Sequence, residues 1–361
     1  MPLIIGGGPA GAAAAIMLAR SGMAPVIVER SCQPADVICG GFLSWNSVAL
    51  LQRCGVDPLA LGGYPIDRAR LFSGRRMAEL PLPAGSVGLS RGRLDAALLD
   101  GAVQAGAQLR RGVTVRALED GVVRYADGTS ETPDRLILAT GKHDLRGAAR
   151  TVASHDPAIG LRWRFRLEEG QAWALGSAIE LHLFAGGYAG LVMQEEGMAN
   201  LCLAVRRSAF LAAGRRPAAL LRTLSNEAPV LADRLGGGEF DAERAQAIAN
   251  IPYGWRAGGI AGNTYRVGDQ IGVIPSLAGE GVAIALATGM AAADAVVAGY
   301  APQAYQARCS GRLARPIRSA VMLWTLAERP LLARLALPVL NVAPGLGTAL
   351  MRMTRVNAVR L

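Results

Sequence analysis

The sequence predicts an α/β fold in which a Rossmann-like parallel sheet is interrupted by a second, sheet-based unit and followed by a helical C-terminus. Three observations predict this fold. A buried strand, a glycine-rich turn, a helix and another strand follow one another within residues 3–29. A buried apolar strand at 136–139 and the segment 265–269 return the chain to the same domain. Between them, residues 155–255 contain strands that alternate with a period of two.

Composition excludes several classes of protein. Of the 361 residues 51% are apolar and 18% are charged, which excludes a disordered chain and a coiled coil. The net charge is +10, and residues 301–361 contribute +8 of it, with nine arginines against Glu328. No nucleic-acid recognition motif accompanies this charge. The basic, apolar segment suits an anionic membrane surface or an acidic partner, or else a pair of solvated arginine-rich helices packed on the body.

Cysteine usage and hydropathy predict a cytoplasmic location, with membrane association left open. The five cysteines form no CxxC pair, which indicates reduced thiols, and the three scattered histidines predict no metal site. Residues 335–351 are uncharged but contain two prolines and two glycines, so a membrane-spanning helix is not expected there. The apolar N-terminus has no basic leader, so no secretion signal is expected.

The first thirty residues predict a bound dinucleotide. Gly6 allows the tight turn after strand 3–5, Gly8 lets the backbone approach a pyrophosphate, and Gly11 lets the following helix pack close to the strand. The phosphates would then lie at a helix N-terminus, where free N–H groups favour negative charge. Glu29, at the end of the next strand, is well placed to accept hydrogen bonds from a ribose.

Further elements follow in order along the chain. Cys39-Gly40-Gly41 leads into a helix, residues 65–82 are strands, and Ser90 opens another helix. Two Asp-Gly pairs, Asp120-Gly121 and Asp127-Gly128, predict hairpin turns before the buried strand 136–139. A long helix is expected over 279–298.

Four of these elements, taken together, resemble a known family. They are the glycine motif with Glu29, Cys39-Gly40-Gly41, Arg91-x-x-Leu94-Asp95, and Gly268-Asp269 followed by Pro275-x-x-x-Gly279-Glu280-Gly281. The set resembles the FAD-dependent oxidoreductases of the aromatic-hydroxylase fold, and within it the geranylgeranyl-reductase branch. The similarity covers residues 1–145 and 260–300 well and the region between them poorly.

The resemblance implies a domain organisation. A discontinuous FAD-binding domain would comprise residues 1–64, 84–150 and 260–300. An inserted β-sheet-based substrate domain would comprise 65–83 and 151–259, and 301–361 would form a helical, basic C-terminal segment.

The resemblance also implies residue roles. Glu29 would bind the adenosine ribose, Arg91 would lie alongside the nucleotide, and Asp269 would bind the ribityl chain. Gly279-Glu280-Gly281 would place a helix N-terminus under the flavin. The cofactor-binding residues expected on this basis are Gly6, Gly8, Pro9, Ala10, Gly11, Glu29, Arg30, Cys39, Gly40, Gly41, Arg91, Gly268, Asp269, Pro275, Gly279, Glu280, Gly281 and Val282.

Cys39 is the candidate catalytic residue, because in the reductases the corresponding cysteine lies near the reactive face of the flavin; the alternative is a small buried hydrophobe. The arginine-rich strand 162–166 favours a substrate with an acidic headgroup. Aromatic residues in a sheet belong either to a pocket or to the core. The candidate substrate-facing residues are Trp45, Trp163, Phe165, Tyr188 and Met193.

The expected activity is that of an FAD-dependent oxidoreductase acting on a lipophilic isoprenoid, polyketide or aromatic molecule. NAD(P)H would reduce the flavin, and a hydride would pass to an activated C=C bond. The alternative is an FAD-dependent monooxygenase that hydroxylates an aromatic or polyketide-type substrate. A quinone-linked electron-transfer flavoprotein is the third hypothesis, and the basic C-terminal segment supports it. The expected partners are the small molecule and a membrane surface, and no nucleic acid.

Overall fold

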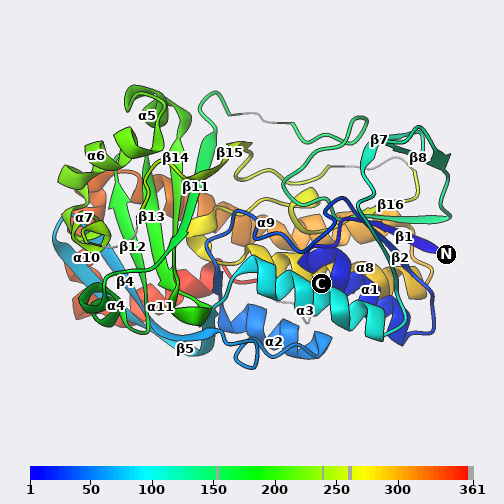
Figure 1. The fold of residues 1–361 in the computed structure, drawn as a ribbon, viewed down its shortest axis with the longest axis horizontal. Helices are drawn as coiled ribbons and strands as arrows, with labels where there is room; N and C mark the ends of the chain where they lie inside the picture. The colour runs from blue at the N-terminus through cyan, green and yellow to red at the C-terminus, as the bar shows by residue number, and fades with distance from the viewer. Residues whose placement is uncertain (152–153, 238–239, 259–261, 357–361) are drawn as a thin grey trace.

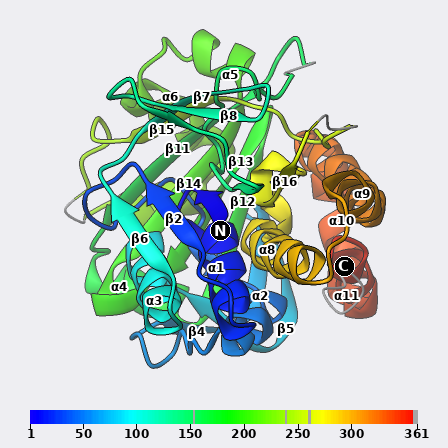
Figure 2. The same ribbon diagram turned by 90° about the vertical axis from the view of Figure 1, so that its right-hand side faces the viewer.

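The computed structural model describes residues 1–151, 154–237, 240–258 and 262–356. Arg360 of the basic C-terminal segment lies outside the described residues. Two sheets lie next to each other (Figure 1). The first contains strands from residues 2–29, 108–138 and 264–266, and the second contains strands from 42–88 and 158–251. The three C-terminal helices form a layer along one side of the molecule (Figure 2).

The first sheet is parallel, with the strand order β16-β10-β1-β2-β6. Both faces of its central strands β1, β2 and β10 are buried, which explains why these strands are mainly apolar, whereas the edge strand β6 is polar and partly exposed. Helices α1 (Pro9–Arg20), α3 (Arg91–Gln104) and α8 (Gly281–Val297) cover one face. A small sheet of β7 (Val115–Glu119), β8 (Val122–Tyr125) and β9 (Ser130–Glu131) covers the other. The strands of the parallel sheet are β1 (Pro2–Ile5), β2 (Val26–Glu29), β6 (Gln108–Arg111), β10 (Arg135–Leu138) and β16 (Thr264–Arg266).

Two local predictions for this region are confirmed. The β7–β8 hairpin turns at Asp120 and Gly121, both with positive φ (52° and 80°), as a two-residue hairpin turn requires. The alanine-rich helix α1 begins with Pro9 at its first turn and packs closely on α8. At their contact a Cβ on Gly289 would lie 2.2 Å from the carbonyl oxygen of Ala10, so only glycine fits there.

The second sheet has eight strands in the order β15-β11-β14-β13-β12-β4-β5-β3. Helices α4 (Glu169–Leu175), α5 (Arg207–Ala212), α6 (Pro217–Glu227) and α7 (Pro229–Leu235) lie against one face. Helix α2 (Trp45–Cys54) connects two strands of this sheet, β3 and β4, and packs in the same core as α1 and α8. The strands are β3 (Phe42–Leu43), β4 (Tyr64–Ser73), β5 (Arg76–Gly88), β11 (Ala158–Phe165), β12 (Ala178–Phe184), β13 (Gly187–Met193), β14 (Ala199–Arg206) and β15 (Gln246–Ile251).

The C-terminal helices α9 (Pro302–Ala327), α10 (Pro330–Val342) and α11 (Pro344–Met353) each begin with a proline in the first turn. Among the described helices, none is long and apolar enough to cross a membrane alone. Only α10 and α11 together satisfy that length and composition, and they are bent by 114° at their junction. The predicted α/β fold, with a parallel sheet, an inserted sheet unit and a helical C-terminus, is confirmed.

Candidate active site

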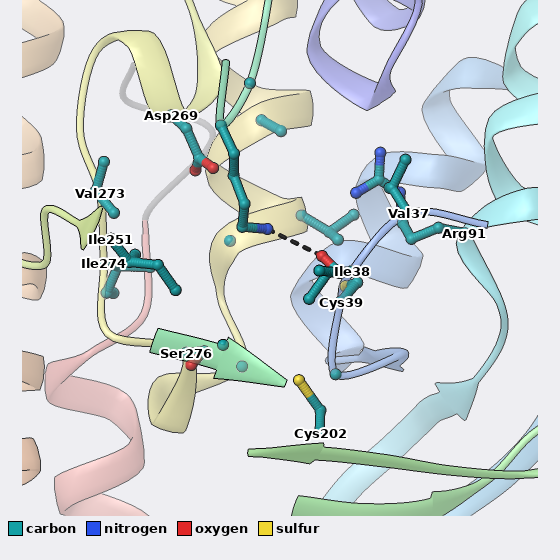
Figure 3. A pocket seen from close by; sticks show the side chains of 18 of the residues that line it. Val37, Ile38, Cys39, Arg91, Cys202, Ile251, Asp269, Val273, Ile274 and Ser276 are labelled. Atoms are coloured by element: carbon teal, nitrogen blue, oxygen red, sulfur yellow. Dashed lines mark hydrogen bonds between the residues drawn. The ribbon is translucent and has the colours of Figure 1, made fainter. Parts of the chain in front are cut away.

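A single large cavity of about 1110 Å³ runs between the two sheets. One end lies at the carboxyl ends of β1 and β2, where α/β sheets bind their ligands. The other end lies between the second sheet and helices α9–α11. Figure 3 shows its middle part, where Cys39, Cys202, Asp269 and Ser276 surround the same space.

The glycine turn at the first end has the geometry that a pyrophosphate site needs. Gly6 has φ +104°, and a Cβ there would lie 2.4 Å from the carbonyl oxygen of Ala139. A Cβ on Gly11 would lie 2.0 Å from the carbonyl oxygen of Gly6, so Gly11 packs the helix on the strand and does not line the cavity. Gly8 faces the cavity, and its Cβ would meet only the Arg91 guanidinium, at 3.4 Å. The N–H groups of the first turn of α1 are thus open to an anion.

Glu29 lies at the end of β2 and lines the cavity. Its carboxylate accepts hydrogen bonds from the backbone N–H of Gly7 at 2.8 Å and of Ser31 at 2.9 Å. The neighbouring Arg30 donates to Nε2 of His143 at 2.6 Å, so this imidazole accepts and is neutral. Burial, and next the charge of Arg30, lower the pKa of His143. A ribose approaching Glu29 would therefore meet an oriented carboxylate beside a cationic loop.

Arg91 both forms an internal ion pair and borders the cavity. Its guanidinium forms a bidentate ion pair with Asp95, with N–O distances of 2.8 and 2.6 Å. The pair is largely buried, and Arg91 still borders the cavity next to Gly8. Because Asp95 fixes the planar guanidinium, Arg91 can present its remaining N–H groups to a nucleotide without losing side-chain entropy on binding.

The Cys39-Gly40-Gly41 turn is held by side chains that sequence reasoning missed. Asn200 Nδ2 donates to the carbonyl oxygens of Cys39 at 3.2 Å and Gly40 at 2.9 Å. Lys142 Nζ donates to the Ile38 carbonyl oxygen at 3.1 Å, the dashed line in Figure 3. The one signal for Lys142 is that it is the chain's single lysine.

Cys39 shares its part of the cavity with a second thiol. Cys202, on β14, also lines the cavity, and burial raises its pKa to about 12. Cys202 therefore remains a neutral thiol at physiological pH, which makes it a lining group and not a nucleophile.

The Gly-Asp pair and the following loop lie at the middle of the cavity. Gly268 has φ +60° and donates its N–H to Thr288 Oγ1 at 2.8 Å, and Asp269 faces the cavity. Gly279, Gly281 and Val282 line the cavity where α8 begins.

Two predicted cofactor residues of this loop do not line the cavity. Pro275 precedes the short helical turn Ser276–Ala278, and Glu280 is completely buried on the far side of the loop. Glu280 accepts hydrogen bonds from Ser44 Oγ at 2.7 Å and Asn46 Nδ2 at 3.1 Å, and pairs with Arg355. Glu280 thus fixes the loop from behind and cannot contact a ligand in the cavity.

Most of the predicted substrate-facing residues lie elsewhere, and alternation along the strands explains why. Gly160 and Gly190 face the cavity, so the residues of opposite parity, Trp163 and Met193, face away from it. The predictions for Trp163, Phe165 and Met193 are therefore wrong, because these three side chains pack in the core beneath α6 and α7.

The prediction that Trp45 faces the substrate is also wrong. Trp45 lies at the start of α2 with the Arg355 guanidinium 4.3 Å above its ring, and it does not line the cavity. Among the five predicted residues, Tyr188 alone lines it.

The arginines of β11 are bound within the protein. Arg162 pairs with Asp36 at 2.6 Å and donates to Asn200 Oδ1 at 2.6 Å, while Arg164 pairs with Glu195 at 2.7 Å. The expectation that this strand binds an acidic headgroup is therefore wrong, since these carboxylates already neutralise it.

Tyr188 belongs to a hydrogen-bonded triad of hydroxyl groups. Its hydroxyl donates to Ser276 Oγ at 2.8 Å, and the Tyr253 hydroxyl lies 2.6 Å from the same oxygen. Trp324, from α9, packs edge-on against both tyrosine rings. Burial raises the pKa of both tyrosines, so both hydroxyls are protonated at neutral pH. Three O–H groups share two internal hydrogen bonds, which leaves one O–H for a ligand.

The wall beyond the triad is aliphatic. It is made of alternate residues of β4, β5 and β12 on one side and of α9, α10 and α11 on the other. The residues of this wall are Ala69, Leu71, Leu80, Leu82, Ile179, Leu181, Leu183, Leu323, Leu326, Leu332, Ala333, Ala336, Leu337, Leu340, Leu350 and Met351.

The glycine cradle at Gly6–Gly11, the open first turn of α1 and the oriented Glu29 carboxylate fit FAD, and with the Cys39-Gly40-Gly41 turn they define an FAD-dependent oxidoreductase. Residues 2–147 match the FAD binding domain family. The chain is 30% identical over 325 residues to menaquinone reductase of Mycolicibacterium smegmatis, covering 82% of this chain and 76% of that protein. The chain belongs to the FAD-dependent oxidoreductase family that includes this reductase.

Two further comparisons agree with this assignment. The chloroplastic geranylgeranyl diphosphate reductase of Oryza sativa subsp. japonica is 26% identical over 331 residues, or 82% of this chain and 66% of that protein. The structure of the flavin-dependent brominase Bmp2 superposes with a TM-score of 0.77 at 18% identity, covering 98% of this chain and 92% of that chain. The latter similarity shows the fold alone. The predicted resemblance to this fold and to the reductase branch is thus confirmed.

Proposed function

We propose that this protein is an FAD-dependent reductase that saturates a C=C bond in the isoprenoid chain of a menaquinone-like lipid, with NAD(P)H as the source of electrons. The observation that carries the proposal is the continuity of the cavity from the Cys39-Gly40-Gly41 turn to the aliphatic wall under α10. A wall without charged side chains suits a hydrocarbon chain, and the names of the reductases in the family are consistent with such a substrate.

The reaction would break one C=C π bond and form two C–H bonds. When bound, FAD supplies the hydride that it has received from NAD(P)H, and the second hydrogen arrives as a proton. The Tyr188–Ser276–Tyr253 triad is the proposed proton source, because it lies between the flavin end and the aliphatic wall and has one O–H to spare. The other two hydroxyl groups of the triad can then pass a proton to the group that has donated one.

The rest of the site would orient the reactants. Asn200 and Lys142 hold the backbone of the Cys39-Gly40-Gly41 turn from both sides, which fixes the distance between the flavin end and the triad. Cys39 and Cys202 would border the reacting carbons as compact side chains. The aliphatic wall would exclude water from the reaction.

The test is an anaerobic turnover assay with the FAD-loaded protein, NADH or NADPH, and a detergent-solubilised menaquinone with a short isoprenoid tail. We expect oxidation of the nucleotide and a product with two additional hydrogen atoms in the tail, identified by mass spectrometry. Reduction of the quinone ring with an unchanged tail would contradict the proposal. So would a product that gains oxygen only in air, as the monooxygenase hypothesis requires. Absence of flavin reduction by either nucleotide would instead favour the electron-transfer flavoprotein.

A further inference from the structure

Helix α10 carries an exposed apolar stripe on its outer surface. Leu331, Leu335 and Val342 are exposed by 74%, 68% and 88%, and they follow the spacing of one helical face. Val339 of the same helix and Leu346 of α11 are also more than half exposed. Single exposed leucines are common on soluble proteins, but a continuous stripe on adjoining helices indicates an interaction surface. We call these five residues the outer stripe.

The opposite face of the same helix lines the cavity. Ala333, Leu337 and Leu340 are buried and belong to the aliphatic wall. Helix α10 is therefore apolar on both faces, and in Figure 2 the C-terminal helices form a single layer between the second sheet and the outside. The outer stripe and the cavity are thus separated by the thickness of one helix.

The cavity reaches the surface beside the outer stripe. Leu326, at the end of α9, and Leu332, at the start of α10, both line the cavity, and they are exposed by 42% and 40%. These two side chains contact the cavity and the solvent at once, so the junction of α9 and α10 is an opening with apolar edges.

Arginines lie beside the outer stripe. A second, smaller groove at the turn between β4 and β5 is lined by Arg75, Arg76 and Arg334 together with Leu331 and Leu335 of the outer stripe. Arg76 donates to the backbone carbonyl of Arg334, and the 71% exposed Arg75 forms an ion pair with Asp233 at 3.3 Å. The one acidic side chain described between residues 301 and 356, Glu328, is already bound by Arg206. The surface around the outer stripe is therefore cationic.

We propose that the outer stripe and this arginine rim dock the protein on the surface of an anionic lipid bilayer, so that a lipid substrate enters the cavity between Leu326 and Leu332. An apolar face flanked by arginines is the chemistry of a helix that lies in the membrane interface. The 13 residues of α10 span only about 20 Å, less than the hydrocarbon core of about 30 Å, and the 114° bend turns α11 away. This geometry favours lying on the bilayer over crossing it. The route of the substrate rests on the proposed function, whereas the docking itself does not.

The test is flotation of the full-length, FAD-loaded protein with vesicles of phosphatidylcholine alone or with 30% phosphatidylglycerol. We expect binding to the anionic vesicles, weakened by salt. The variant Leu335→Glu/Val342→Glu should bind them at least about tenfold more weakly, because two carboxylates would enter the interface. Arg334→Gln should bind about fivefold more weakly. FAD absorbance and thermal unfolding check that each variant is folded.

A matched control is Trp173→Glu. Trp173, on α4, is 86% exposed and lies on the other side of the second sheet from α10, so this control adds an acid in place of a large apolar residue away from the proposed surface. It should bind vesicles as the wild type does. Equal binding of the wild type and the double variant would overturn the docking proposal. The proposal would also be overturned if the outer stripe joined two copies of the chain. In that case the wild type would be a dimer that does not bind vesicles, and the double variant would be a monomer.

The two proposals fail separately. Turnover of a detergent-solubilised menaquinone by a protein that ignores vesicles would overturn docking and leave the reductase function intact. Salt-sensitive vesicle binding without turnover would do the reverse.

Discussion

The two ends of the cavity differ in whether backbone or side chains form the wall. At the nucleotide end the wall is backbone, and Gly6, Gly8 and Gly11 are required because a Cβ would strike a carbonyl oxygen or fill the ligand space. At the aliphatic end the wall consists of aliphatic side chains that could exchange with one another at similar volume. Positions at the nucleotide end therefore accept only particular residues, whereas positions at the other end accept any side chain of suitable polarity and size.

The largest effect is expected behind the nucleotide end, where the C-terminal segment is fixed to it. Arg355, just after α11, pairs with the completely buried Glu280 in the loop before α8. Replacing it in Arg355→Met should lower the free energy of unfolding by about 3–5 kcal/mol, because an unpaired carboxylate would stay buried. Urea unfolding of the apo protein measures this. The double variant Glu280→Gln/Arg355→Met should recover most of the loss, and no recovery would show that the ion pair is not the cause.

A somewhat smaller effect is expected within the nucleotide end, where two glycines have different tasks. Gly11→Ala should lower the free energy of unfolding by about 3 kcal/mol, because its Cβ would lie 2.0 Å from the Gly6 carbonyl oxygen. Gly8→Ala should leave the apo protein almost as stable and instead weaken FAD binding, since its Cβ meets only the Arg91 side chain. Thermal unfolding and FAD titration separate the two results. Equal loss of stability in both variants would contradict the assignment.

The smallest of the three effects concerns the junction between the ends. Removing both phenolic hydroxyls in Tyr188→Phe/Tyr253→Phe should lower kcat for the proposed reduction by about a hundredfold, the lower range for a lost proton donor. The rate at which NAD(P)H reduces the flavin should not change, because the triad does not take part in that step. Tyr300→Phe is the matched control, since Tyr300 is exposed and does not line the cavity. A hundredfold loss in flavin reduction as well would indicate a structural effect.

The nucleotide end could be predicted from the sequence because its backbone geometry requires particular residue types at particular spacings. Glycines placed between a strand and a helix, with Glu29 after the next strand, indicate one specific backbone geometry. Glu280 is expected from the motif to bind the cofactor but is buried behind the loop, because a motif does not tell which side of a loop a side chain occupies.

The aliphatic end could not be predicted in the same way. Trp163, Phe165 and Met193 have the composition of a pocket, yet the parity of their strands places them in the core. The period of two divides a strand into two faces, but a single sequence does not say which face meets a ligand. The leucines of α10 likewise follow no pattern that separates the cavity from the core, and Tyr253 and Trp324 come to Tyr188 from distant parts of the chain.

The single lysine of the chain makes this site chemically addressable. The other 37 of the 38 Lys and Arg residues are arginines, so Lys142 carries the one side-chain amine that an acylating reagent converts to a stable amide. Because the Lys142 ammonium is bound to the Ile38 carbonyl within the cavity, its acylation rate reports on access to that place. A mass-spectrometric label at one position would thus follow ligand entry in a protein of native sequence, without any engineered residue.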